Sequence, residues 1–174
     1  MVKPGDIEAA IRNVPDFPKA GIQFKDITPV LGDARLFAGT IDLLTNDFKP
    51  GSVDAVVGID ARGFIFAAAA AIKLGAGFVP VRKKGKLPFK THEQDYALEY
   101  GSATVAMHVD ALKPGARVLL VDDLLATGGT AAAAAALVKK LGAQIVEVSF
   151  LIELKFLNGR EKLKEYPVRS VVAY

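Results

Sequence analysis

The sequence predicts an α/β fold with a mainly parallel, twisted sheet flanked by helices, and three observations support this. Short apolar runs suited to strands alternate with segments of helical periodicity along the chain. Residues 145–152 are apolar almost throughout, which is typical of a strand buried on both faces. Residues 118–121 are apolar and lead directly into acidic and small residues, as at the carboxyl end of a parallel strand, where ligands bind in such sheets.

Length, composition and charge narrow the class of protein further. The 174 residues are 51% hydrophobic, which is enough for one domain with a substantial core. The net charge of +3 is a modest excess that suits an anionic small molecule, whereas a nucleic acid usually requires denser basic clusters. Because cysteine is absent, disulfides and thiolate metal sites are excluded.

Neither the N-terminus nor the alanine-rich residues 64–74 have the character of a targeting or membrane segment. The first residues lack the apolar core of a signal peptide, and the alanine-rich stretch is too short and interrupted to span a bilayer. We therefore expect a cytoplasmic protein that has neither a membrane nor a nucleic acid as its partner.

In the first half of the chain, capping residues and periodicity predict the elements. Asp6 is expected to cap a helix over residues 7–13, and residues 33–48 carry apolar side chains at helical spacing. Between them, residues 14–29 are rich in proline and glycine and predict an ordered but irregular segment. The remaining expected elements are a strand over 53–59, a helix over 64–74 ended by Gly75, and a strand over 78–81.

In the second half, the basic residues 82–95 contain two glycine or proline breaks and few apolar residues, so we predict a mobile loop with His92 on its surface. A hairpin is expected around Gly101, and His108 is expected at a strand end. The expected strands are 96–99, 103–107, 118–121, 145–152 and 168–172, with helices over 130–141, ended by Gly142, and over 158–166.

The small residues 126–130 are candidates for binding a phosphate. Gly128 and Gly129 allow the backbone to close tightly around a ligand, and the free N–H groups at the start of the following helix favour an anion. Thr127 and Thr130 can add hydroxyl donors. The loop is neither a P-loop nor a dinucleotide fingerprint, because it lacks both glycine patterns.

Asp122 and Asp123 come directly before this loop. Ionised carboxylates only accept hydrogen bonds, so the two hydroxyls of a vicinal diol are suitable partners. A diol beside a phosphate describes a ribose 5-phosphate. The alternative is that the aspartates cap the turn and that the glycines merely form it.

The string VLLVDDLLATGGT at 118–130 resembles the 5-phosphoribosyl 1-pyrophosphate (PRPP) binding motif of type I phosphoribosyltransferases, and most closely that of the adenine phosphoribosyltransferases. Residues 14–31 (VPDFPKAGIQFKDITPVL) resemble the N-terminal hood of that family, and residues 58–64 (GIDARGF) resemble its pyrophosphate loop. Residues 82–88 (RKKGKLP), continuing to residues 96–101 (YALEYG), resemble its flexible catalytic loop. The resemblance runs from about Val14 to Lys162. It implies the type I phosphoribosyltransferase fold in a single domain over 1–174, with a hood over about 1–32 and a flexible catalytic loop.

The resemblance implies that ribosyl 5-phosphate passes from PRPP to N9 of adenine, giving AMP and pyrophosphate. It also implies Mg²⁺ as cofactor, held mainly by PRPP and water rather than directly by protein side chains. It further implies a homodimer and a cis peptide bond between Asp60 and Ala61. The implied site residues are Ala126, Thr127, Gly128, Gly129 and Thr130 for the 5-phosphate; Asp122 and Asp123 for the ribose hydroxyls; Arg62, Arg82, Lys83 and Lys86 for pyrophosphate; Gln23, Phe24, Lys25 and Leu154 for adenine; and Glu99 as general acid or base, so that Glu99, Asp122, Asp123 and Arg62 form the catalytic group.

Several of these residues have a simpler interpretation. Arg62 suits a surface ion pair, Glu99 an exposed strand carboxylate, and Phe24 and Leu154 an ordinary core; Lys84 and Lys90 are interpreted as solvated charges. For the whole chain, two alternative functions stay open. One is a related enzyme acting on hypoxanthine, guanine or xanthine. The other is a non-catalytic regulator that senses PRPP. Regulators of that kind usually carry an added DNA-binding domain, for which this sequence offers no spare length.

Overall fold

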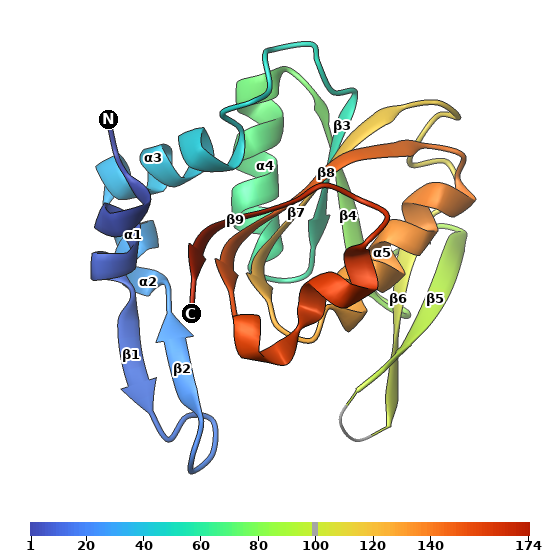
Figure 1. Ribbon diagram of the computed structural model, residues 1–174. Coiled ribbons are helices and arrows are strands. Elements are labelled where there is room, and N and C mark those ends of the chain that lie inside the picture. Colours follow the sequence, from blue (N-terminus) through green and yellow to red (C-terminus); the bar gives the residue numbers. More distant parts are fainter. Residues whose placement is uncertain (99–100) are drawn as a thin grey trace. The chain divides into compact units, whose positions relative to one another are not determined.

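The computed structural model describes residues 1–98 and 101–174 (Figure 1). The chain divides into two compact units, Met1–Leu43 and Leu44–Tyr174, which are described separately. The expectation of a single domain with a hood over about 1–32 stays a prediction. No helix in the described part of the chain is both long and apolar enough to cross a membrane.

The first unit contains a β-hairpin where the sequence predicted an irregular segment, so that prediction is wrong. Its elements are α1 (Pro4–Ala10), β1 (Arg12–Pro15), β2 (Gln23–Asp26), α2 (Thr28–Gly32) and most of α3 (Ala34–Leu44). β1 and β2 are antiparallel, with Val14 opposite Phe24. The prolines are tolerated because Pro15 takes the last ladder position and the cis Pro18 lies in the connecting loop.

The helices of this unit begin and end differently from the prediction. α1 begins at Pro4, a favoured first helical residue, and Asp6 lies in its first turn and accepts the Lys3 N–H at 2.8 Å. α3 begins one residue after Asp33, whose carboxylate accepts the Leu36 N–H at 2.9 Å. α3 ends at Leu44 rather than at residue 48.

The second unit is built on a seven-stranded sheet among the described residues, in the order β5–β6–β4–β3–β7–β8–β9 (Figure 1). The strands β4, β3, β7, β8 and β9 are parallel, and β5 and β6 are antiparallel to their neighbours. The predicted mainly parallel sheet is therefore confirmed. The bounds are β3 (Ala55–Ile59), β4 (Gly77–Lys83), β5 (Thr91–Ala97), β6 (Ser102–His108), β7 (Arg117–Leu125), β8 (Gln144–Glu153) and β9 (Val168–Ala173).

Two helices cover opposite faces of this sheet. α4 (Gly63–Leu74) packs on β3, β4 and β7, and α5 (Gly129–Lys140) packs on β5 to β8. Val57 lies in one core cluster with the alanines of α5. Gly58, the next residue, faces α4, since a methyl group there would lie 2.6 Å from Ala67 Cβ. Because successive side chains of a strand point to opposite faces, both faces of β3 are buried, which explains its apolar sequence.

Two strands extend further than predicted. β4 continues to Lys83 and β5 begins at Thr91, so both ends of the predicted loop 82–95 are strands and His92 lies half-buried on β5. The sequence hid β5 because it is an edge strand whose backbone is paired with β6 but whose side chains are mostly polar. The hairpin around Gly101 and the strand end at His108 are confirmed.

β7 continues through Leu125, so Asp122 and Asp123 belong to the strand rather than following it. β8 supplies the partner for this extension, because Leu125 pairs with Glu153, whereas pairing with β3 stops at Val121. The predicted helix over 158–166 is replaced by two 3₁₀ turns, η1 (Lys155–Leu157) and η2 (Gly159–Leu163). Asn158 separates them in a left-handed conformation, with φ of 53°.

Candidate functional site

The predicted site residues of the second unit gather at the carboxyl ends of its parallel strands. Arg62 follows β3, Arg82 lies near the end of β4, and Asp122 and Asp123 lie near the end of β7. Since β4, β3 and β7 are neighbours in the sheet, these ends share one edge, where α/β sheets bind their ligands. Two ion pairs across the strand ends confirm that the structure brings the residues together.

The first ion pair joins the β3 and β7 ends. Arg62 Nε donates to Asp123 Oδ2 at 2.5 Å, and the Asp123 side chain is 11% exposed while that of Arg62 is 46% exposed. Arg62 is the residue before the first turn of α4, so the helix start fixes its position. The guanidinium thus neutralises a carboxylate that the sequence assigned to the ribose, and its outer part faces solvent, where an anion could reach it.

The second ion pair joins β4 to the loop after β3. Arg82 Nε donates to Asp60 Oδ2 at 3.0 Å, and Arg82 also donates to the carbonyl oxygen of Lys86 at 3.1 Å. The peptide bond between Asp60 and Ala61 is cis, as the resemblance implied. The basic turn after β4 is therefore tied to the loop after β3, with Lys83 and Lys86 exposed on it.

Asp122 differs from its neighbour in its electrostatic environment. Burial raises the pKa of Asp122 well above its ordinary value, and the adjacent charge of Asp123 raises it further. Asp122 Oδ1 accepts the N–H of Asp123 at 2.9 Å. A methyl group at Gly63 would lie 2.6 Å from the same oxygen. The absence of a side chain at Gly63 therefore makes room for the Asp122 carboxyl, a role that the sequence reasoning missed although Gly63 lies in a recognised motif.

Residues 126–130, which we call the phosphate loop, run from the end of β7 into the first two residues of α5. They line a small cavity of about 80 Å³ together with Asp122, Leu124, Leu125 and Ala131. Gly128 has a φ of +80°, which favours glycine, and it precedes the first residue of the 12-residue helix α5. The first N–H groups of a helix have no partner within the helix, so the start of α5, with the positive end of its dipole, favours an anion at this loop. The anion-binding role of the loop stays a prediction.

The predicted adenine residues lie in both units, and each set is described within its own unit. In the first unit, Gln23 is exposed, the Phe24 ring meets the Phe17 ring edge-on at 5.1 Å, and Lys25 Nζ donates to Asn13 Oδ1 at 2.6 Å.

In the second unit, Leu154 is half-buried directly after β8, and its N–H donates to the carbonyl oxygen of Leu125 at 2.9 Å. This hydrogen bond links the residue that follows β8 to the end of β7. Glu99, the predicted general acid or base, lies outside the described residues.

Other charges of the basic turn form pairs away from the site. Lys84 Nζ lies 2.7 Å from Glu93 Oε2, and this hydrogen bond raises the pKa of Lys84. In the described ranges 1–98 and 101–174, no three His, Asp or Glu side chains gather as cation ligands. Mg²⁺ beside phosphates usually takes most of its ligands from substrate oxygens and water.

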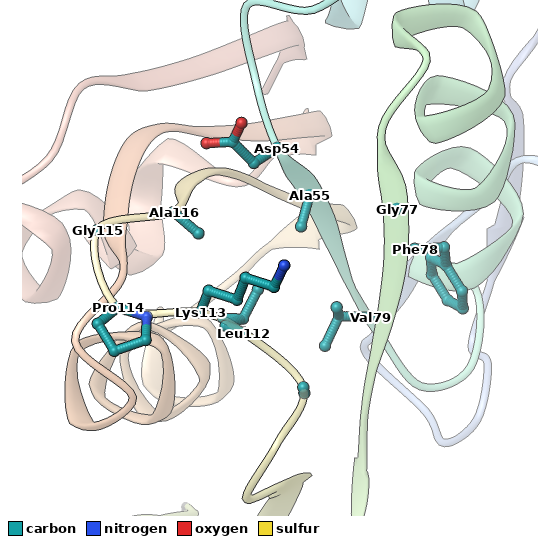
Figure 2. A pocket seen from close by; sticks show the side chains of 11 residues that line it. Asp54, Ala55, Gly77, Phe78, Val79, Leu112, Lys113, Pro114, Gly115 and Ala116 are labelled. Atoms are coloured by element: carbon teal, nitrogen blue, oxygen red, sulfur yellow. The ribbon is translucent and has the colours of Figure 1, made fainter.

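A cavity of about 590 Å³ lies at the opposite, amino ends of the parallel strands (Figure 2). Ala55 at the start of β3 and Val79 on β4 contribute to its wall, and Figure 2 shows Lys113 extending toward Ala55. Asp54 at its rim is held by the Arg117 guanidinium. The cavity is thus distinct from the edge that carries the predicted site residues.

Comparison with known proteins identifies the class to which this fold and site belong. Residues 32–172 match the family model of the phosphoribosyl transferase domain. The chain is 59% identical over 169 residues to the adenine phosphoribosyltransferase of Acidothermus cellulolyticus, covering 97% of this chain and 96% of that protein. This chain belongs to the adenine phosphoribosyltransferase family of type I phosphoribosyltransferases.

Solved structures agree with this assignment. The adenine phosphoribosyltransferase of Rhodothermus marinus has a TM-score of 0.93 and 51% sequence identity, with 98% of each chain covered. The enzyme of Saccharomyces cerevisiae, complexed with an imino-altritol bisphosphate and adenine, has a TM-score of 0.91 and 41% identity, with 97% of each chain covered. The predicted family and fold class are confirmed.

Proposed function

We propose that this protein is a purine-salvage enzyme that transfers ribosyl 5-phosphate from PRPP to N9 of adenine, giving AMP and pyrophosphate. The observation that carries the proposal is the Arg62–Asp123 pair beside Asp122 and the phosphate loop, at the carboxyl edge of the sheet in a chain of this family. Its relatives bear the name of this activity, and the yeast structure contains adenine.

In the proposed complex, the enzyme holds both charged ends of PRPP. The phosphate loop binds the 5-phosphate through backbone N–H groups and the hydroxyls of Thr127 and Thr130. The pyrophosphate lies against the basic edge, where guanidinium groups form paired hydrogen bonds with phosphate oxygens. The residues proposed for pyrophosphate are Arg62, Arg82, Lys83 and Lys86.

The reaction breaks the bond from the anomeric carbon to pyrophosphate and forms the bond to N9 of adenine. Positive charge builds on the ribose ring as pyrophosphate leaves, and Asp122 and Asp123, which accept from the ribose hydroxyls, stabilise that charge. Gln23, Phe24, Lys25 and Leu154 orient the adenine. Glu99 accepts the N9 proton, a step that contributes about 10²–10⁴ in rate.

Mg²⁺ would be held by pyrophosphate and ribose oxygens with water, and when bound it neutralises charge on the leaving pyrophosphate. This is consistent with the arginine-paired carboxylates of the site, since Asp60 and Asp123 are already matched by Arg82 and Arg62. No step proposed for the protein side chains requires a direct bond between metal and protein.

We further propose that the enzyme acts in the cytoplasm as a homodimer, without nucleic acid or membrane as a partner. Ile65 and Ile72 on α4 and Phe78 on β4 are 39%, 84% and 38% exposed, and exposed apolar side chains of this size are common at protein interfaces. Light scattering after gel filtration tests this: a dimer mass is expected, and Ile72→Glu should lower it.

The deciding experiment incubates the protein with PRPP, Mg²⁺ and one base at a time and follows nucleotide formation. AMP from adenine is expected, with little product from hypoxanthine, guanine or xanthine. Product from hypoxanthine and none from adenine would favour a 6-oxopurine enzyme, and DNA binding without turnover of any base would favour a regulator. Glu99→Gln should lower kcat more than it weakens PRPP binding; an equal loss of both contradicts the proton-transfer role.

A further inference from the structure

The phosphate loop lies directly on the backbone of Gly159, the first residue of η2, to which no role has been assigned. A methyl group at Gly159 would clash with the carbonyl oxygen of Ala126 and would lie 2.8 Å from Leu125 Cδ1. Reciprocally, a methyl group at Gly128 would clash with the carbonyl oxygen of Gly159. The two glycines therefore pack backbone against backbone, and the path of the phosphate loop depends on where Gly159 is held.

Arg160, the next residue, holds this turn in place. Its Nε and one terminal nitrogen donate to the two carboxylate oxygens of Glu153, both at 2.7 Å. It also donates to the carbonyl oxygen of Val168 at 2.7 Å and to Ser170 Oγ at 3.0 Å. Because Glu153 ends β8 and the other two acceptors belong to β9, Arg160 ties η2 to two neighbouring strands.

Glu153 is a buried acceptor for this arginine. It is 4% exposed, and its second oxygen also accepts the Ser170 hydroxyl at 2.6 Å. The hydrogen bonds from Arg160 hold the pKa of Glu153 below its ordinary value, so the carboxylate is ionised at neutral pH. Removing Arg160 would leave a buried charge without its main partner, which is strongly unfavourable and would release the turn.

We infer that Gly159 and Arg160 are positioning residues for the phosphate loop, fixing the backbone N–H groups that bind the 5-phosphate of the substrate. The inference rests on the proposed function, because it takes the 5-phosphate role of residues 126–130 from there. Neither residue touches a reacting atom. Their loss should therefore weaken ligands that carry a 5-phosphate, such as PRPP, AMP and ribose 5-phosphate, more than it weakens adenine.

A second arginine that pairs with a glutamate of β8 provides a matched control. Arg169 on β9 makes a similar bidentate pair with Glu147 on β8, at 2.8 and 3.1 Å, and also pairs with Asp47. Glu147 lies in the first half of β8, whereas Glu153 is its last residue beside the phosphate loop. The Arg169–Glu147 pair joins β9 to β8, and Arg160 ties η2 to the same two strands, but only Arg160 adjoins a residue that contacts the loop.

The test measures the Kd of ribose 5-phosphate by calorimetry for Gly159→Ala, Arg160→Met and Arg169→Met, with urea unfolding of each variant. Gly159→Ala and Arg160→Met are expected to bind about tenfold or more weakly, which is the effect of losing one good hydrogen bond to a charged group. Arg169→Met should bind ribose 5-phosphate normally although it also loses stability. In turnover, the KM for PRPP should rise in the first two variants while the KM for adenine stays the same.

Unchanged ribose 5-phosphate affinity in both Gly159→Ala and Arg160→Met, or an equal loss in Arg169→Met, would overturn the inference. If Arg160→Met does not fold, Arg160→Lys, which keeps one donor for Glu153, should fold and show a smaller loss in the same direction. Failure of the proposed function has a different signature, namely no AMP from adenine and PRPP with the unsubstituted protein. Ribose 5-phosphate binding still reports on the positioning role in that case.

Discussion

The strands β3 and β7 carry an aspartate–arginine pair at each end, and the two pairs are built differently. At the amino ends, Arg117 donates through its backbone N–H, its Nε and a terminal nitrogen to Asp54, at 2.7, 3.0 and 2.8 Å. These hydrogen bonds lower the pKa of Asp54 to about 2. The charges at this end satisfy each other within the fold.

At the carboxyl ends, Arg62 pairs with Asp123, but a second carboxyl, Asp122, lies beside them. Burial and the charge of Asp123 raise the pKa of Asp122, so its ionised form is disfavoured in the protein alone. Strongly perturbed groups of this kind gather at functional sites, where a ligand completes the arrangement. The end with matched charges stabilises the fold, whereas the end with a surplus, half-buried carboxyl is prepared for a ligand.

The largest expected effect separates the two ends by activity. Replacing Asp122 and Asp123 together with Asn should lower kcat/KM by about 10³ or more, because charge stabilisation at the ribose is lost. Asp54→Asn, the matched change at the other end, should leave turnover of adenine and PRPP nearly unchanged. Initial rates and circular dichroism measure both variants. Full activity in the folded double variant contradicts the assignment of the ribose site.

Removing the arginines should produce the next largest difference. Arg62→Ala should raise the KM for PRPP and lower kcat/KM by about 10²-fold, the expected loss of a bidentate, charge-assisted contact with pyrophosphate. Arg117→Ala should lower the melting temperature and leave the KM for PRPP as it is. If the two variants lose activity equally, the Arg62–Asp123 ion pair has a structural role rather than a functional one.

A pair of glycines tests the geometry of the two ends more finely. Gly63→Ala places a methyl group 2.6 Å from Asp122 Oδ1, so the carboxyl must shift, and kcat should fall by about tenfold or more. In Gly77→Ala, at the amino end, the nearest atom to the new methyl group would be the carbonyl oxygen of Asp54 at 3.8 Å, which is an ordinary van der Waals contact. Steady-state kinetics should separate these two variants; equal kinetics means that the position of Asp122 is not critical.

The smallest effects concern stability, and they should have opposite signs at the two ends. The raised pKa of Asp122 means that the folded protein binds its proton more tightly than the unfolded chain, so the contribution of Asp122 to stability falls as pH rises above about 4. Asp122→Asn should therefore gain stability relative to wild type as pH rises above about 4. The lowered pKa of Asp54 contributes stability above about pH 4 that is lost as pH falls toward about 2.

Asp54→Asn should accordingly be less stable than wild type at pH 7, and the difference should disappear in acid. Urea unfolding at a series of pH values measures both variants against wild type. The comparison of the two ends is wrong if both aspartates change stability in the same direction with pH.

Much of the candidate site could be predicted from the sequence because its parts are local. The acidic pair, the small residues of the phosphate loop and the helix that follows are contiguous, and each has its own physical signature. The strand ends were less predictable. The local sequence predicts a strand that ends before Asp122 and Asp123. Nothing in it indicates that β8 continues to pair with β7 after β3 has ended.

The alternation of strands and helices, the burial of the central strands and the order of the ligand-binding segments all follow from local sequence. Hydrophobic periodicity and turn residues act between near neighbours, and so they can be recognised without the fold. The arrangement of the strands in space brings Arg62 to Asp123 and Arg82 to Asp60, and it leaves no room for side chains at Gly63 and Gly159. These contacts join residues far apart in the chain. They depend on which strands are neighbours and how closely two backbones approach, and local sequence carries neither kind of information.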